Sequence, residues 1–335
     1  MKSVSITSKE SAISIVDVPA PISSQDEVLI SIQASALNHR DVWISKGMYA
    51  KIQYPVIPGS DGSGIIIASH SKHAPIGSRV MINPNINWGD HAEIQSSQYS
   101  ILGMPSQGTM AELISVPADR VHPIPDHLTF EQAAALPLAG LTAYRAVFTK
   151  GMIGSGHTVL ITGIGGGVAL MAMQFALAAG ATVYCTSGTE EKIHKAIALG
   201  ASGGVLYHLE DWSKQLHSMN PKGFDCIIDS AGGMQWNELT GLLKPGGRLV
   251  FYGATNGNVP NLSLQRLFWK QITICGSTMG SDAEFEMMLH FCKHHGIIPI
   301  IDSIYSLDDA SSAFAHMNSG MQFGKIVLHH GQSGK

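Results

Sequence analysis

A glycine-rich turn near the middle of the chain, between a short apolar strand and a long apolar helix, constrains the fold most. The segments are, in order, strand, turn, helix and strand: 158–162 (TVLIT), 163–169 (GIGGGVA), 170–179 and 182–186. A unit of about 30 residues with this order has the size of a βαβ crossover. Glycines in such a turn let a dinucleotide pyrophosphate approach the N–H groups at the helix start. Val168 and Leu170 break the strict G-x-G-x-x-G/A spacing, so an ordinary turn between core elements is the alternative.

The composition is that of a lightly charged globular chain with room for two domains in 335 residues. A net charge of −4 gives no electrostatic reason to expect nucleic acid or a membrane as partner. No apolar run reaches the roughly 18 residues of a membrane-spanning helix, and the start lacks an apolar signal region. The four cysteines form no CxxC pair, which favours buried thiols. We therefore expect a cytoplasmic protein.

Two patterns divide the chain. Short β-branched runs separated by turn signals predict a β-rich first part, with strands at 27–33, 64–68, 79–82 and 111–116. A capping box, Thr129 with Gln132, predicts the start of a helix. From there onward helices and strands alternate, which is typical of an α/β parallel doubly wound sheet. Its strands are expected at 158–162, 182–186, 225–229, 248–252 and 272–275, and its helices near 168–179, 190–199 and 234–243.

The last part of the chain returns to the first domain. A capping box, Ser281 with Glu284, predicts a helix that runs to about His294. A second helix is expected from Ser306, followed by a closing strand at 325–328. The predicted domains are a β-rich domain of residues 1–127 and 281–335, and a nucleotide-binding domain of residues 128–280.

Seven segments in this order resemble the medium-chain dehydrogenase/reductases over nearly the whole chain, and most of all their zinc-free, NADPH-dependent quinone-oxidoreductase-like members. They are 37–41, 55–64, 133–144, 163–169, 224–230, 243–248 and 323–327. The resemblance implies a GroES-like catalytic domain and a Rossmann domain, with the active site in the cleft between them. Ala169 replaces the last glycine of the family's phosphate loop, a mild change because a methyl group still permits close helix–strand packing.

Zinc ligands are missing from the positions where the resemblance would put them. Those positions hold Asn38, Ser60 and Leu138, which supply neither a thiolate nor an imidazole. The region of a structural zinc lobe, roughly 87–108, has no cysteine, and a solvated loop is the simpler account of its Asp90, His91 and Glu93. The prediction is no metal at either site.

The residues after the second Rossmann strand favour NADP over NAD. An NAD-binding domain places a carboxylate there for the ribose hydroxyls, but this chain has Ser187. Thr186 and Ser187 offer hydroxyl donors, and Lys192 offers a cation to a 2′-phosphate. In the alternative account Thr189 caps a helix and Lys192 is a surface charge.

The resemblance implies roles for individual residues. Asn38 would donate to the substrate oxygen, a backbone group or Arg40 would be a second donor, and Asp41 joins these catalytic candidates although a buried structural role is favoured for it. The substrate pocket would include Trp43, Tyr49 and Ser60, with a core-filling role as the alternative for Trp43 and Tyr49. The cofactor-binding candidates are His39, Thr142, Gly163, Gly166, Gly167, Val168, Thr186, Ser187, Lys192, Ser230, Gly253, Ala254, Ser277 and Lys325, the last of which could instead be a solubilising lysine on an edge strand.

These predictions combine into an NADPH-dependent, zinc-independent oxidoreductase that reduces quinones, enones or aldehydes by direct hydride transfer. The alternatives are a zinc-type alcohol dehydrogenase and a non-enzymatic NADPH-binding protein. The resemblance also implies that the strand at 272–275 pairs across a twofold axis, and we expect a homodimer because an apolar edge strand left open would be a liability.

Overall fold

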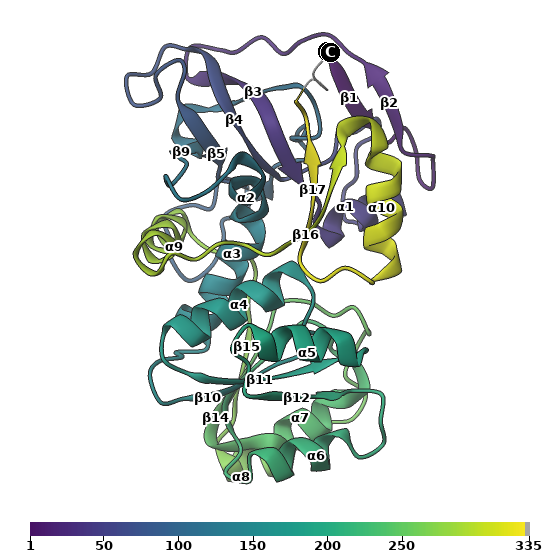
Figure 1. Ribbon diagram of the computed structural model, residues 1–335, viewed down its shortest axis with the longest axis vertical. Helices are drawn as coiled ribbons and strands as arrows, with labels where there is room; N and C mark the ends of the chain where they lie inside the picture. The colour runs from purple at the N-terminus through teal and green to yellow at the C-terminus, as the bar shows by residue number, and fades with distance from the viewer. Residues whose placement is uncertain (332–335) are drawn as a thin grey trace. The chain divides into compact units, whose positions relative to one another are not determined.

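The computed structural model describes residues 1–331 and divides into two compact units (Figure 1). Unit 1 contains residues 1–139 and the described residues from Ser281 onward, and unit 2 contains residues 140–280. The sequence-based boundary at 127/128 lies earlier because helix α2 (Phe130–Ala135) belongs to unit 1. Ala134 and Ala135 are fully buried there in one cluster with two alanines of strand β3 (Glu27–Ala36).

Unit 2 is built on a six-stranded parallel sheet with the strand order β12-β11-β10-β13-β14-β15. This order is that of a Rossmann fold, with its switch point between β10 and β13. The strands are β10 (Thr158–Ile161), β11 (Thr182–Ser187), β12 (Gly203–Leu206), β13 (Phe224–Asp229), β14 (Leu243–Phe251) and β15 (Thr273–Gly276).

Helices follow most of these strands (Figure 1). They are α4 (Gly167–Ala178), α5 (Glu190–Ala198), α6 (Trp212–Met219), the 3₁₀ turn η3 (Gly233–Gln235), α7 (Trp236–Leu242) and α8 (Leu264–Lys270). Helix α3 (Pro137–Tyr144) and a π-helical segment η2 (Arg145–Lys150) lead into the unit. The predicted fold class is confirmed, and each predicted strand of this unit overlaps an observed one, although β14 begins at Leu243 rather than at 248. Strand β12 and helices α6 and α8 were not predicted.

Unit 1 contains a seven-stranded, mainly antiparallel sheet. Its main path is β16-β17-β3-β4-β5-β9, and β8 pairs with β3 beside that path. The strands are β3 (Glu27–Ala36), β4 (Asp61–Ser69), β5 (Arg79–Ile82), β8 (Leu113–Pro117), β9 (Val121–Pro123), β16 (Ile301–Ser306) and β17 (Lys325–His329). Two small pairs, β1 (Lys2–Ser5) with β2 (Ser14–Asp17) and β6 (Asn85–Ile86) with β7 (Ser100–Ile101), complete the strands.

The remaining elements of unit 1 are helix α1 (His39–Ser45), the 3₁₀ turns η1 (Ala118–Arg120) and η4 (Leu307–Asp309), helix α9 (Asp282–His295) and helix α10 (Ala310–Ser319). Both predicted capping boxes are present, because Thr129 and Ser281 each accept a hydrogen bond from the N–H three residues on. No helix of the described residues is both long and apolar enough to cross a membrane.

The position of strand β17 contradicts the alternative that Lys325 is a solubilising lysine on an edge strand. Strand β17 lies inside the sheet, between β16 and β3, and the Lys325 at its start is 4% exposed. A lysine that solubilises an open edge would point into water. Lys325 therefore has a role inside the unit rather than at a solvated edge.

Candidate active site

The turn from β3 into helix α1 carries the catalytic candidates of unit 1. Asn38 is the N-cap residue of α1, and its backbone N–H donates to Asp41 Oδ2 at 2.8 Å. The other carboxylate oxygen of Asp41 accepts from the N–H of Gly59 at 3.1 Å. Burial raises the pKa of Asp41, while the charge of Arg40 opposes this shift. Asp41 thus connects the start of α1 to the 59–61 segment. These contacts agree with the buried structural role that the sequence favours for Asp41.

The side chain of Asn38 belongs to a buried polar cluster with Asp61 and Lys325. Lys325 Nζ donates to Asn38 Oδ1 at 2.6 Å and to Asp61 Oδ2 at 2.9 Å. Asn38 Nδ2 donates to the same Asp61 oxygen at 2.9 Å. The second oxygen of Asp61 accepts from the backbone N–H of Leu138 at 2.8 Å. Buried charges of this kind persist where they are paired and hydrogen-bonded.

Arg40 is buried and uses its guanidinium donors within the protein. Nη1 donates to Ser60 Oγ at 2.5 Å and to the carbonyl oxygen of Leu102 at 2.7 Å. Nη2 reaches the carbonyl oxygens of residues 101 and 104 at 3.5 and 3.4 Å, and Nε donates to Tyr49 Oη at 3.2 Å. All five N–H donors of an arginine are then engaged. Arg40 holds the 101–104 loop in this structure, which differs from the catalytic role predicted for it.

The three predicted pocket residues lie around this arginine and helix α1. Ser60 is fully buried, and its hydroxyl donates to the Leu102 carbonyl oxygen at 2.8 Å. The ring of Tyr49 packs against the core cluster that contains Leu37 and Val42, and the Arg40 guanidinium lies 4.9 Å from the ring centroid. Trp43 lies on α1 and is half-buried, with the Lys46 ammonium 5.7 Å from its ring centroid.

His39, at the start of α1, is the predicted cofactor residue of this segment. It is exposed, yet the surrounding protein lowers the pKa of its imidazole, and the Lys325 charge lowers this pKa further. A neutral imidazole donates one hydrogen bond and accepts one.

In unit 2 the glycine-rich turn connects β10 to α4 at the switch point of the sheet. Gly163 and Gly165 have φ values of +63° and +126°, a region that favours glycine. Gly166 is the N-cap residue of α4 and provides no capping side chain, and Gly167 and Val168 begin the helix. The first N–H groups of α4 therefore have no side-chain cap. A helix start of this kind binds anions.

The end of β11 supports this turn and adds a residue that sequence reasoning missed. Thr186 Oγ1 accepts from the N–H of Gly163 at 3.2 Å, and Ser187 Oγ accepts from the N–H of Thr189 at 3.2 Å. Thr189 caps helix α5 through the N–H of Lys192. A Cβ atom at Gly188 would lie 2.7 Å from the hydroxyl oxygen of Tyr207, so that hydroxyl lies directly over Gly188. Tyr207 follows β12, which was not predicted.

The loop after β13 forms the other side of the switch point. Asp229, buried at the end of β13, accepts from Thr162 Oγ1 at 2.6 Å, from the N–H of Gly232 at 2.8 Å and from Trp236 Nε1 at 2.9 Å. These bonds fix the residues that flank Ser230.

The other predicted cofactor residues of unit 2 lie in the loops after β14 and β15 and on α3. A Cβ atom at Gly253 would lie 2.7 Å from the Ser230 carbonyl oxygen, so this position, next to Ala254, has no room for a side chain. Thr142 Oγ1 donates to Met279 Sδ at 3.6 Å. Ser277 Oγ is buried without a hydrogen-bond partner. A buried hydroxyl of this kind is costly unless a ligand or water satisfies it.

The residues of unit 2 fit a dinucleotide. The uncapped start of α4 fits a pyrophosphate, and Ser277 has a free hydroxyl. The hydroxyl residues at the end of β11, Thr186 and Ser187, are both 1% exposed in this structure. The residues of unit 1 do not fit zinc. Asn38 Oδ1 has an ammonium group 2.6 Å away, Ser60 is bonded to Arg40, and Leu138 has no side-chain donor. Within residues 1–331, no three His, Cys, Asp or Glu side chains are arranged to hold a metal ion.

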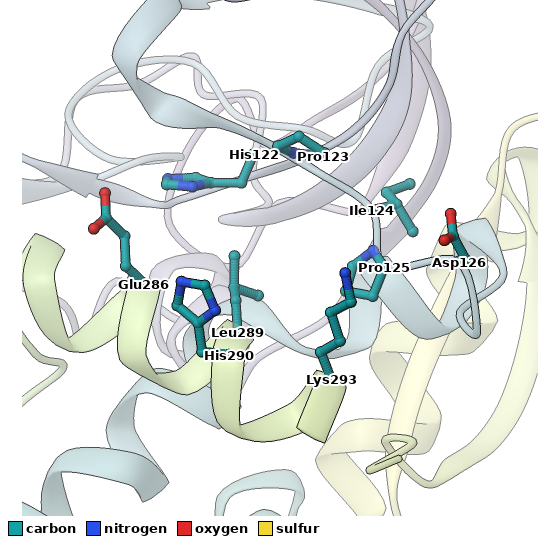
Figure 2. Close-up of a pocket in the computed structure, with 9 residues that line it drawn as sticks. All are labelled: His122, Pro123, Ile124, Pro125, Asp126, Glu286, Leu289, His290 and Lys293. Atoms are coloured by element: carbon teal, nitrogen blue, oxygen red, sulfur yellow. The ribbon is translucent and has the colours of Figure 1, made fainter. Parts of the chain in front are cut away.

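A separate hollow of about 410 Å³ lies in unit 1, between the segment that begins at β9 and one face of α9 (Figure 2). His122 faces it from the strand side, and Glu286, His290 and Lys293 face it from α9 (Figure 2). Its charges are mixed, and it contains none of the predicted site residues.

Comparison with known proteins agrees with this architecture. Residues 24–126 match the alcohol dehydrogenase GroES-like domain, and residues 167–294 match the zinc-binding dehydrogenase domain. The zinc-type alcohol dehydrogenase-like protein YogA of Leptosphaeria maculans is 35% identical, with 94% of this chain and 93% of the relative covered. The chain belongs to the medium-chain dehydrogenase/reductase family.

Two further relatives of this medium-chain dehydrogenase/reductase differ in their activities. A quinone oxidoreductase of Lama guanicoe is 31% identical, with 93% of this chain and 91% of the relative covered. The crystal structure of an NAD-dependent alcohol dehydrogenase has a TM-score of 0.93 and 32% identity, covering 99% of this chain and 100% of that one. The chain is therefore an oxidoreductase with a nucleotide-binding dehydrogenase fold.

Proposed function

We propose that this protein is an NADPH-dependent, zinc-independent oxidoreductase that reduces quinones, enones or aldehydes by direct hydride transfer. The observation that carries the proposal is the Asn38 carboxamide, which is held in a buried cluster by an ammonium and a carboxylate where the family's zinc enzymes have a metal ligand. A carboxamide there supplies a hydrogen-bond donor in place of a Lewis acid.

When bound, NADPH supplies the hydride for such a reduction. The contribution of the protein is to stabilise the negative charge that then develops on the substrate oxygen. Asn38 Nδ2 is the donor for this oxygen, whether it becomes an alkoxide, a phenolate or an enolate. One well-placed donor is worth about 3 kcal/mol, or two to three decades of rate. Solvent supplies the proton that completes the reduction.

The residues around the end of β11 support NADPH over NADH. A carboxylate about 4 Å from a 2′-phosphate would cost on the order of 4 kcal/mol at an effective dielectric constant near 20. Ser187 replaces that carboxylate, and the hydroxyl of Tyr207 over Gly188 adds a second hydroxyl to the same segment. Lys192 adds a cation to the first turn of α5, which also contains Glu190 and Glu191.

We also propose that the protein is a homodimer. Strand β15 is at the edge of its sheet, and the neighbouring helix α8 exposes Phe268 and Trp269 to 69% and 83%. Exposed strand edges and large apolar side chains favour association. Light scattering on the purified protein is expected to give twice the chain mass, and a single chain mass would contradict the proposal.

The test of the activity uses purified protein, NADPH and a panel of quinones, enals and simple aldehydes. We expect NADPH oxidation that a chelator leaves unchanged, with at least roughly a hundredfold loss of kcat in Asn38→Ala, in line with the loss of one donor. Loss of activity on chelation, with one zinc per chain by elemental analysis, would instead indicate a zinc-type alcohol dehydrogenase. Tight NADPH binding without turnover of any substrate would indicate a non-enzymatic protein.

A further inference from the structure

We propose that Asp61 and Lys325 are positioning residues, which orient the Asn38 carboxamide so that one of its N–H bonds remains available to the substrate. This inference rests on the proposed function, because it assigns to Asn38 the role of oxyanion donor. It adds two residues that the sequence did not connect with that role, one at the start of β4 and one at the start of β17.

Chemistry alone decides which way the carboxamide faces. An ammonium only donates, so the atom 2.6 Å from Lys325 Nζ has to be the carbonyl oxygen of Asn38. An ionised carboxylate only accepts, so the atom 2.9 Å from Asp61 Oδ2 has to be the amide nitrogen. Rotating the carboxamide by half a turn would replace both attractions with repulsions. The pair therefore selects a single orientation.

This orientation leaves one donor unused. The amide nitrogen carries two hydrogens, and one of them bonds to Asp61. No other residue in the described part of the chain accepts the second. Lys325 also withdraws electron density from the amide through its bond to Oδ1, which strengthens the remaining N–H as a donor.

The pair is rigid because its charges are buried. Asp61 is fully buried, and Lys325 is 4% exposed. The Leu138 N–H fixes the second oxygen of the Asp61 carboxylate at 2.8 Å. Removing one partner would leave the other as an unpaired buried charge, a strongly destabilising change. A donor held in this way is already oriented before substrate arrives, which is the condition for efficient charge stabilisation.

An exchange of the two side chains separates positioning from simple structural support. Asn38→Asp places two carboxylates side by side, and Asp61→Asn leaves Lys325 without a charged partner. The double variant Asn38→Asp/Asp61→Asn restores one carboxylate and one carboxamide. The carboxylate now at position 38 accepts from Lys325 and from the new amide at position 61, whose carbonyl oxygen can still accept from Leu138. The hydrogen bond from Lys325 to position 61 is lost, because an amide nitrogen takes the place of that acceptor oxygen. Position 38, however, no longer has any donor for a substrate.

We expect both single variants to lose thermal stability and the exchange variant to regain part of it, because the charge pair is restored although the hydrogen bond from Lys325 to position 61 is not. The kcat of the exchange variant is expected to stay roughly a hundredfold or more below that of the wild type, as for loss of a single oxyanion donor. The NADPH dissociation constant should change little in any of these variants. Asp225→Asn is the matched control, because Asp225 also accepts from a lysine, Lys244 at 2.6 Å, and from a backbone N–H. It should keep the kcat of the wild type.

Two results would overturn the inference. One is a wild-type kcat in Asp61→Asn or in the exchange variant, because orientation of Asn38 would then be unimportant. The other is additive stability losses at positions 38 and 61, because a shared network requires coupling between them. The stability measurements need no substrate. They therefore test the network even if the wild-type protein reduces none of the panel and the proposed function fails.

Discussion

A partly buried histidine makes the stability of unit 1 sensitive to acid. His330 follows strand β17, and its Nδ1 lies 3.1 Å from the carbonyl oxygen of Ala111, so Nδ1 carries the proton and donates. Its Nε2 then accepts from the hydroxyl of Ser35 at 2.8 Å. Burial lowers the pKa of His330 from 6.5 to about 3. The folded protein thus holds this imidazole neutral where the unfolded chain would protonate it.

The sign and the size of the effect follow from proton linkage. Because the unfolded state binds the extra proton, the contribution of His330 to stability is complete above pH 6.5 and decreases as the pH falls toward 3. Each pH unit within this range lowers the free energy of unfolding by up to about 1.4 kcal/mol, so roughly 2–3 kcal/mol is lost between about pH 6 and pH 4.

The assay compares urea unfolding of the wild type and His330→Asn at four values between about pH 7 and pH 4. Asparagine can keep the donor to Ala111 but does not titrate. We expect the variant to be less stable at neutral pH, and the difference between the two proteins to shrink by roughly 2–3 kcal/mol at the acid end of the series. His73→Asn, at an exposed histidine, should follow the wild type throughout. A stability difference that stays constant over the whole series would refute the explanation.

Three further predictions concern single side chains. Ser187→Asp should lower kcat/KM for NADPH about a thousandfold relative to NADH, because a carboxylate would face the 2′-phosphate; an unchanged ratio of the two kcat/KM values would count against NADPH preference. Asp229→Ala should lower the free energy of unfolding by about 3 kcal/mol in denaturant titrations, since it leaves Trp236 Nε1 and backbone N–H groups unpaired. Arg40→Met should lower the melting temperature but leave kcat within about threefold, if Arg40 holds the 101–104 loop; a roughly hundredfold loss of kcat at full folding would instead restore its catalytic role.

The sequence predicted the nucleotide-binding half of the fold well, because its signals are local. Strands β10 and β11 and helix α4 are apolar elements separated by glycines, and they begin and end within a residue of their predicted limits. Strand β12 was missed because it starts with two glycines. A Cβ atom at Gly204 would lie 2.7 Å from Cys185 Sγ, so close packing favours glycine at this position. Glycine is not typical of strands, and the sequence pattern therefore did not indicate one.

The candidate site was predictable only in part, because its contacts join distant segments. Asn38 could be singled out from its motif and the family resemblance, but its two partners could not. Asp61 and Lys325 are 264 residues apart in the sequence, and no local pattern connects them. For Arg40 the motif predicted a catalytic role. Its hydrogen bonds to the carbonyl oxygens of the 101–104 loop instead indicate that it stabilises this loop.

The late return of the chain to its first sheet has a consequence for synthesis on the ribosome. Strand β3 receives its neighbour β17 only after all of unit 2 has been made. Until then, Asp61 has no ammonium partner and the Ala34–Ala36 end of one edge of β3 is unpaired, so the nascent first half carries both an uncompensated charge and a short open edge that favours aggregation. The middle unit, in contrast, is contiguous and can fold as soon as it emerges. The polar cluster of Asn38, Asp61 and Lys325 can therefore assemble only near the end of synthesis, although Asn38 and Asp61 are made early.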